Sequence, residues 1–178
     1  MKRQGVGESL ISEEELQNRI QELAVEIDRD YKDKHPIVIS VLKGAFYFVA
    51  DLTRAISTPV NIDFLAISQM PGVSRDTGIV RISKDLDLSI AERHVIMVED
   101  IIDTGLTLAY LLQNLAPRRP KSLNVCVLLD NPARRLVELP IKYTGFHIPD
   151  QYVVGYGLDY KEEYRHLPYI AAYEKDDQ

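Results

Sequence analysis

The amino-acid sequence predicts an α/β fold with a mostly parallel central sheet, helices on both faces of that sheet and a small hood. Short apolar runs alternate along the chain with segments of helical periodicity, which is typical of strand–helix–strand units. Several of these runs are apolar at nearly every position, as expected for parallel strands buried on both faces. Aromatic-rich runs in the last third of the chain, with no helical segment between them, predict the hood.

The first helix is predicted from a capping box. Ser12 and Glu15 have the spacing at which each side chain can bond to the backbone N–H of the other residue at a helix start. Apolar residues then recur at helical spacing, at Leu16, Ile20, Leu23, Ala24 and Ile27. The helix is expected to end near residues 32–34, because His35 precedes a proline and such a position disfavours helix.

The other elements follow from the position of each run. Apolar runs predict strands at residues 37–42, 60–68, 79–85, 94–100 and 122–130, and helical periodicity predicts helices at 45–56 and 106–116. The polar stretch 69–78 contains Pro and Gly and predicts a long functional loop. Three late strands are expected at 143–150, 151–160 and 169–174.

Composition fits one globular domain with a core. The chain has 178 residues, of which 46% are hydrophobic and 27% charged. We expect residues 1–178 to form a single domain, with the N-terminal residues and roughly residues 145–178 as the hood. The formal net charge of −6 argues against a nucleic-acid coat protein.

The single cysteine and the absence of long apolar stretches indicate the cellular location of the protein. Cys126 lies in an apolar run and is expected to be a small buried hydrophobic residue rather than a catalytic thiol. The sequence shows no membrane-spanning stretch and no signal peptide in its first residues, so we expect a cytoplasmic protein with no membrane partner.

Carboxylates crowd the end of one predicted strand. Glu99, Asp100 and Asp103 lie within "VIMVEDIIDTGLTL", residues 95–108. In open parallel sheets, ligands bind beyond the carboxyl ends of the strands. Lys43-Gly44 and Asp130-Asn131 follow two other predicted strands, so the three loops are expected to converge and form a cleft at one edge.

The turn after these carboxylates suits a phosphate monoester. Residues 103–107 lead into a predicted helix, whose first backbone N–H groups have no partner within the helix. Gly105 allows close approach, and Thr104 and Thr107 supply hydroxyls. The segment is not a Walker loop, because no Gly-x-x-x-x-Gly-Lys pattern is present.

The acidic side chains predict a metal or a sugar as ligand. Glu99 and Asp100 are expected to face a divalent cation or sugar hydroxyls, and Mg²⁺ commonly uses one or two protein carboxylates. Asp103 is a candidate proton acceptor. A single carboxylate at a strand end more often caps a helix or points to solvent, but that explanation does not fit the whole set.

The stretch "VIMVEDIIDTGLTL" resembles the phosphoribosyl-pyrophosphate motif of the type I phosphoribosyltransferases. Four further stretches narrow the resemblance to the hypoxanthine-guanine phosphoribosyltransferases of that family: "VLKGAF" (41–46), "KDLD" (84–87), "GFHIPDQYVVGYGLDY" (145–160) and "EYRHLPYI" (163–170). The resemblance runs from about residue 37 to residue 170. It implies the type I phosphoribosyltransferase fold and a purine-salvage enzyme that converts hypoxanthine or guanine to IMP or GMP and releases pyrophosphate.

The resemblance implies a role for each matching residue on the sugar-phosphate side. Glu99 and Asp100 would hold the ribose hydroxyls and magnesium, and Asp103 would take the proton from purine N7. The 5′-phosphate would bind to Thr104, Gly105, Leu106 and Thr107, and the pyrophosphate to Leu42, Lys43, Gly44 and Arg165. A non-proline cis peptide is expected between Leu42 and Lys43.

The same resemblance implies the residues around the purine. Tyr152 would stack on the base and the backbone of Val153 would meet its edge. Asp159 would lie at the purine pocket and hold a second magnesium ion. A homodimer or homotetramer is expected, with the purine base and phosphoribosyl pyrophosphate as substrates and no nucleic-acid partner.

Two positions depart from the family pattern. Asn131 stands where the family usually has a lysine that donates to the purine 6-oxo group, and an amide can both donate and accept. Ser68-Gln69 stands where a Ser-Tyr pair is common in the mobile loop. Asn131 therefore leaves open a transferase with altered base specificity, or a nucleotide-sensing regulatory protein of the same fold, although the intact carboxylates disfavour the latter.

Overall fold

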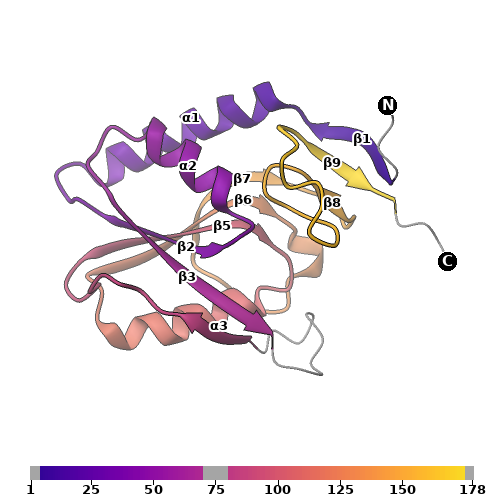
Figure 1. Cartoon of the computed structure of the whole chain (residues 1–178). Coiled ribbons are helices and arrows are strands. Elements are labelled where there is room, and N and C mark those ends of the chain that lie inside the picture. The colour runs from indigo at the N-terminus through magenta and orange to yellow at the C-terminus, as the bar shows by residue number, and fades with distance from the viewer. Residues whose placement is uncertain (1–4, 70–79, 175–178) are drawn as a thin grey trace.

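The chain forms a six-stranded central sheet with helices on both faces (Figure 1). The computed structural model describes residues 5–69 and 80–174. In the order β4-β3-β2-β5-β6-β7, the strands are β4 (Val80–Lys84), β3 (Asn61–Gln69), β2 (Ile37–Leu42), β5 (His94–Ile102), β6 (Ser122–Asp130) and β7 (Ile141–His147). All neighbouring pairs are parallel except β3 and β4. The predicted fold class is confirmed.

The core has two halves, one on each face of this sheet. Helices α1 (Glu13–Asp30) and α2 (Phe46–Ala55) cover one face, and α3 (Leu106–Leu115) covers the other (Figure 1). Leu16 and Phe48 belong to the first half and Leu111 to the second, and all three are fully buried. Strands β2, β5 and β6 contribute side chains to both halves, which explains why their sequences are apolar at nearly every position.

The capping box predicted for the first helix is present. The Ser12 hydroxyl accepts a hydrogen bond from the Glu15 backbone N–H at 3.2 Å, and the Glu15 carboxylate accepts one from the Ser12 N–H at 2.8 Å. The expected end near residues 32–34 is too late, because Tyr31 leaves the helical conformation and Asp33 has a positive φ of 60°. The chain therefore turns towards β2 sooner than the proline requires.

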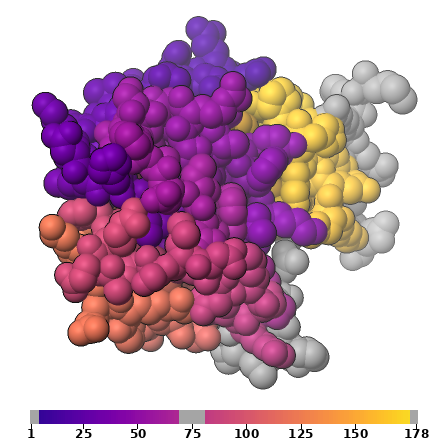
Figure 2. All heavy atoms as spheres, turned by 60° about the vertical axis from the view of Figure 1, so that its left-hand side comes forward, coloured from indigo at the N-terminus to yellow at the C-terminus, as the bar shows by residue number. Residues whose placement is uncertain are grey.

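A second, three-stranded sheet joins the two ends of the described chain. Strand β9 (Ile170–Tyr173) lies between β1 (Val6–Ile11) and β8 (Val153–Val154), and both pairings are antiparallel. We call it the small sheet. In the space-filling view its yellow C-terminal part lies against purple atoms from the first third of the chain (Figure 2).

Several sequence-based boundaries are corrected by the structure. The expected strand at 151–160 is wrong beyond Val153–Val154, because Gly155, Tyr156 and Gly157 have positive φ values of 103°, 49° and 104° and turn the chain. The strand expected at 143–150 spans 141–147 instead, and β5 continues two residues past the predicted end at 100. Glu99 and Asp100 thus lie within a strand.

Two 3₁₀ turns, at Ala116–Arg118 and Pro132–Arg134, complete the described elements. Over residues 5–69 and 80–174, none of the helices combines the length and the apolar character needed to cross a bilayer.

Candidate active site

The carboxyl ends of β2 and β5 meet a turn from the C-terminal part of the chain, and two glycines allow this. A Cβ atom on Gly44 would lie 1.7 Å from Asp100 Oδ2, and one on Gly157 would lie 1.9 Å from the Gly44 carbonyl oxygen. Side chains at either glycine would overlap their neighbours. Three segments far apart in sequence are therefore in direct contact. Two of them, at Gly44 and Asp100, are among the loops predicted to converge, and the third is the turn at Gly157.

The segment after β2 presents a lysine to this edge. The peptide between Leu42 and Lys43 is cis, as the family resemblance predicts. Lys43 Nζ lies 2.8 Å from Glu162 Oε2, with about two thirds of both side chains exposed, at 68% and 59%. Lys43 thus faces the turn that follows Asp159 and not the core.

Burial dominates the electrostatics of the two adjacent carboxyl groups on β5. It raises the pKa of Glu99 well above its usual value, and the neighbouring Asp100 charge raises it further. Burial also raises the pKa of Asp100, although the backbone N–H of Ile101 donates to Asp100 Oδ1 at 2.8 Å and the Arg165 charge acts in the opposite direction. The Asp159 charge raises the pKa of Asp100 as well, so Asp100, Asp159 and Arg165 form one electrostatic group.

The Arg165 guanidinium makes three contacts. Its Nη1 donates to the Gly157 carbonyl at 2.7 Å, and its Nη2 lies 2.8 Å from Asp159 Oδ1. The same Nη2 lies 3.1 Å from Glu162 Oε1. The side chain is 23% exposed, and its buried Nε has no hydrogen-bond partner. Arg165 therefore retains an unused donor at the edge where Lys43 also lies.

Asp103 lies between an amide and an arginine. Asn131 Nδ2 donates to Asp103 Oδ1 at 3.2 Å, and Arg134 Nη1 lies 3.4 Å from Asp103 Oδ2. Asn131 is only 1% exposed, and its Oδ1 is buried without a hydrogen-bond partner. Arg134 also reaches Asp150, at 3.5 Å. The structure thus brings together the candidate proton acceptor and the residue that departs from the family pattern.

The turn that precedes α3 has the shape expected of an anion site. Gly105 is the N-cap residue with a φ of 81°, which glycine adopts without strain. The Leu106 backbone N–H reaches only Thr104 Oγ1, at a long 3.4 Å. Thr107 is in the first turn of α3, where backbone N–H groups have no intrahelical acceptor.

Arg135 clamps this turn from behind, and sequence reasoning did not find it. Its Nε donates to the Asp103 carbonyl at 3.0 Å and its Nη2 to the Ile102 carbonyl at 3.2 Å. It also forms a short ion pair with the buried Asp130. Arg134 and Arg135 follow the strand predicted at 122–130, and this pair of arginines was the available signal in the sequence. The sequence did not show which groups Arg135 contacts.

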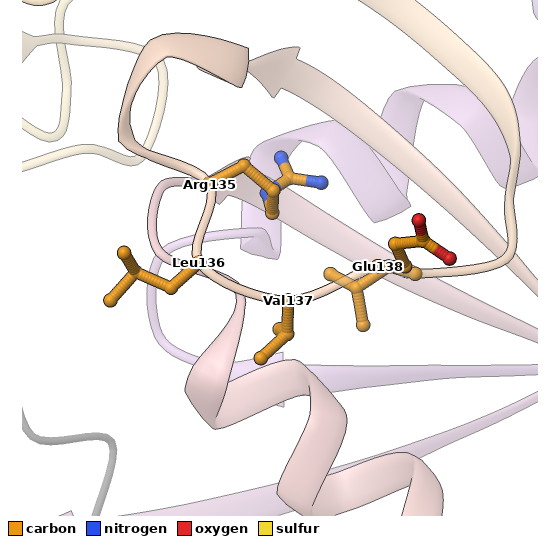
Figure 3. A pocket seen from close by; sticks show the side chains of 5 residues that line it. Arg135, Leu136, Val137 and Glu138 are labelled. Carbon is orange, nitrogen blue, oxygen red and sulfur yellow. The ribbon is translucent and has the colours of Figure 1, made fainter.

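The loop after Arg135 borders an open cavity of about 440 Å³. Figure 3 shows the side chains of Leu136 and Val137 pointing away from the Arg135 guanidinium. The Leu136 N–H donates to the Thr104 carbonyl at 3.0 Å, and a Cβ on Gly105 would lie 3.1 Å from Val137 Cγ2. This loop therefore supports the phosphate-type turn by packing against it.

Apart from Asn131, the residues expected around the purine lie on the small sheet and the turn beside it. The Tyr152 hydroxyl donates to the Asp159 carbonyl at 2.9 Å, and 38% of Tyr152 is exposed. Val153 is buried in β8. Ser68 is exposed near the end of β3 and the backbone of Gln69 ends that strand, whereas most of the predicted loop lies outside the described residues.

The described part of the chain contains no cluster of three or more His, Cys, Asp or Glu side chains that could enclose a metal ion. A Mg²⁺ ion does not require such a cluster, since it keeps water and substrate oxygens and uses one or two carboxylates. The partly buried carboxyl groups of Glu99 and Asp100, whose pKa values are raised by desolvation, are the kind of donors that a divalent cation would stabilise. These residues fit magnesium bound mainly through its substrate.

Fold and site together define an α/β protein whose candidate ligand site lies beyond the carboxyl ends of parallel strands. Comparison with known families is more specific. The family model described as the phosphoribosyl transferase domain matches residues 10–161, and the chain belongs to this family.

Individual relatives agree with that assignment. The chain is 45% identical over 172 residues to the hypoxanthine-guanine phosphoribosyltransferase of Bacillus subtilis (strain 168), covering 97% of this chain and 96% of the relative. It is 46% identical over 166 residues to the hypoxanthine phosphoribosyltransferase of Salmonella typhimurium (strain LT2), covering 92% and 93%. A crystal structure of a hypoxanthine-guanine phosphoribosyltransferase from Bacillus anthracis, with HEPES in its active site, matches with a TM-score of 0.91 and 48% identity, covering 95% and 99%. The resemblance inferred from the sequence is confirmed.

Proposed function

We propose that the protein is a purine-salvage transferase that joins hypoxanthine or guanine to phosphoribosyl pyrophosphate, giving IMP or GMP and pyrophosphate. The observation that carries the proposal is the contact of Gly44 and Gly157 around Asp100, which assembles one site from three distant segments. The names of the relatives supply the substrate class.

Two cationic side chains would receive the leaving group. The bond from ribose C1 to pyrophosphate breaks through a cation-like sugar, so negative charge grows on the pyrophosphate. Lys43 Nζ and the Arg165 guanidinium lie at one edge, 2.8 Å and 3.1 Å from the two oxygens of the Glu162 carboxylate, and the buried Arg165 Nε has no hydrogen-bond partner. Donors fixed in advance stabilise such developing charge without reorganisation.

Asp103 would accept the proton from purine N7. The hydrogen bond from Asn131 orients one of its carboxylate oxygens. The other oxygen lies at a longer distance from Arg134, whose side chain is 44% exposed and can move. A positioned carboxylate of this kind typically contributes about 10²- to 10⁴-fold to a rate.

The sugar phosphate would bind along the turn and the adjacent strand end. Backbone N–H groups at the start of α3 would hold the 5′-phosphate, because that helix end carries unpaired donors and a partial positive charge. Glu99 and Asp100 would hold the ribose hydroxyls. Tyr152 would stack on the purine, and the Val153 backbone would meet its edge.

Magnesium bound to phosphoribosyl pyrophosphate would supply charge neutralisation for the leaving group. Glu99 and Asp100 would hold one magnesium ion, and Asp159, whose charge raises the pKa of Asp100, would hold a second. A cytoplasmic location and a homodimeric or homotetrameric state stay predictions.

The test is nucleotide formation with magnesium, phosphoribosyl pyrophosphate and each of hypoxanthine, guanine, xanthine, adenine and uracil. We expect IMP and GMP to form, with little product from adenine or uracil. No nucleotide from any base would overturn the proposed function.

A further inference from the structure

The Glu162 carboxylate contacts both cations that the proposed function assigns to pyrophosphate. Its Oε2 lies 2.8 Å from Lys43 Nζ, and its Oε1 lies 3.1 Å from Arg165 Nη2. The two contacts lower the pKa of Glu162, with Lys43 as the larger cause. One carboxylate thus bridges an arginine three residues away and a lysine that precedes it by 119 positions in the sequence.

We propose that Glu162 competes with pyrophosphate for Lys43 and Arg165 and thereby weakens product binding. The inference rests on the proposed function, because it takes pyrophosphate as the anion that these two side chains receive. A carboxylate carries one negative charge on two oxygens, whereas pyrophosphate carries more charge on more oxygens. Pyrophosphate therefore displaces Glu162, and Glu162 lowers the affinity for pyrophosphate by the free energy of the contacts that it loses.

Removal of the Glu162 charge leaves Arg165 in place. The guanidinium is fixed by the Gly157 carbonyl at 2.7 Å and by Asp159 at 2.8 Å, and neither contact involves Glu162. The position of Lys43 is set by the chain between β2 and α2, where Gly44 packs against Gly157 and Asp100. Glu162 is thus a competitor of the anion and not a support for the cations.

The contacts of Glu162 are weak enough to exchange. Lys43 is 68% exposed and Glu162 59% exposed, and pairs this open to water are screened. Each such ion pair typically contributes only a small free energy. The loss of two of them corresponds to about a three- to tenfold change in the affinity for pyrophosphate.

The backbone holds Glu162 in an unusual conformation. Lys161 and Glu162 have φ values of 51° and 67°, in the left-handed region that non-glycine residues rarely adopt. The Glu162 N–H donates to Asp159 Oδ2 at 2.8 Å, which fixes this turn. Residues kept in such conformations cluster at ligand-binding segments, where the surrounding structure maintains them.

The chain supplies a matched control in the next residue. Glu163 is exposed and carries the same charge on the same turn, and its described hydrogen bonds, with Tyr160, run through the backbone. Glu163→Gln therefore removes one negative charge beside the site without touching Lys43 or Arg165. This variant measures how far the loss of any negative charge near the site changes the affinity for pyrophosphate, and the effect of Glu162→Gln is compared with it.

The experiment is calorimetric titration of inorganic pyrophosphate, with magnesium present, into the wild type, Glu162→Gln and Glu163→Gln. We expect pyrophosphate to bind about three- to tenfold more tightly to Glu162→Gln and within about twofold of wild type to Glu163→Gln. The gain should shrink as salt is added, because the competition is electrostatic. Affinity for IMP, which lacks the pyrophosphate group, should not change in either variant.

The outcomes separate this inference from the proposed function. Equal or weaker pyrophosphate binding by Glu162→Gln would overturn the competition, and so would an equal gain in Glu163→Gln. If Glu162→Gln does not fold, Glu162→Asn provides the same test, since asparagine tolerates the left-handed conformation. If the wild type binds pyrophosphate and Glu162→Gln binds it no more tightly, only this inference is contradicted. If the wild type makes no nucleotide, the proposed function is contradicted.

Discussion

The Asp100 carboxylate lies directly against the α-carbon of Gly44, at a place where any side chain would collide with it. A Cβ atom built on Gly44 would be 1.7 Å from Asp100 Oδ2 and 2.8 Å from Asp100 Cγ. The contact brings the end of β2 to the acidic end of β5. It makes Gly44 necessary for packing as well as for the proposed binding of pyrophosphate.

Gly44→Ala should therefore disturb both stability and activity. Either the Asp100 carboxylate or the backbone after β2 must move, and overpacking of this kind typically costs about 1–3 kcal/mol. We expect lower thermal stability and a large loss of nucleotide formation. Gly7→Ala in β1 is the milder comparison, because its Cβ would lie 3.3 Å from the Ala172 carbonyl oxygen, a tight contact but far from the overlap at Gly44. Wild-type behaviour of Gly44→Ala would show that this edge is loosely packed.

Asp103→Asn should lose chemistry more than binding. The amide can still accept the hydrogen bond from Asn131 but is a poor proton acceptor. We expect kcat to fall by about 10²-fold or more, with the KM for phosphoribosyl pyrophosphate within a few-fold of wild type. Asp150→Asn removes the other carboxylate near Arg134 and is the control. A kcat within threefold of wild type would remove Asp103 from the role of proton acceptor.

Arg135→Leu should strongly destabilise the fold. It leaves the buried Asp130 carboxylate without its arginine and removes one donor from each of two backbone carbonyls, at Ile102 and Asp103. Breaking a buried ion pair from one side typically costs about 3–5 kcal/mol. The neighbouring Arg134 is 44% exposed, so Arg134→Leu should cost less than about 1 kcal/mol. Urea unfolding of both variants measures the difference, and similar midpoints would contradict the assigned role of Arg135 as a clamp.

The stability of the folded protein should decrease at low pH because Asp30 becomes protonated. Hydrogen bonds from Lys142 and Tyr143 lower the pKa of Asp30 from its usual 3.8 to about 2 in the folded protein. The unfolded chain therefore takes up the proton first as the pH falls. The contribution of Asp30 is full above about pH 3.8 and is lost as the pH approaches 2.

Unfolding of Asp30→Asn at several pH values checks this. The variant should be less stable than wild type at pH 5, and the difference should close as the pH approaches 2. Asp33→Asn, at an exposed position in the following turn, is the control. A constant difference between Asp30→Asn and wild type across this range would contradict the ion pair with Lys142.

Much of the central sheet could be predicted because its signals are local. Parallel strands buried on both faces are apolar throughout, and this fixes β2 at residues 37–42 and β6 at 122–130 as predicted. The capping box of α1 is likewise a four-residue pattern. Burial of Cys126 follows from its place in such a strand.

The small sheet could be predicted only in part because long-range pairing determines it. Most of β1 is exposed or partly buried, so its sequence has no apolar pattern, and its strand conformation depends on β9 far along the chain. Residues 155–157 read as a strand by composition, yet their positive φ values follow from packing against Gly44 and the segment around Leu167.

The site shows the same division between local and distant causes. Proximity of Asp103 to Asn131 follows from two strand ends at one edge of a parallel sheet, and the structure places them 3.2 Å apart. The clamp by Arg135 and the bridge by Glu162 depend on side-chain directions in irregular turns, for which no periodic pattern exists. Such contacts become visible only when the backbone is known.

The pairing of β1 with β9 has a mechanical consequence. The two strands are antiparallel, and the Glu174 N–H donates to the Gly5 carbonyl at 2.9 Å, so the outer ends of both strands lie side by side. A pulling force applied to both of these ends would load the inter-strand hydrogen bonds one after another, like a zipper, and not all at once. Because β9 is also the partner of β8, peeling it away would detach Val153 and its neighbours from their support before the central sheet was strained.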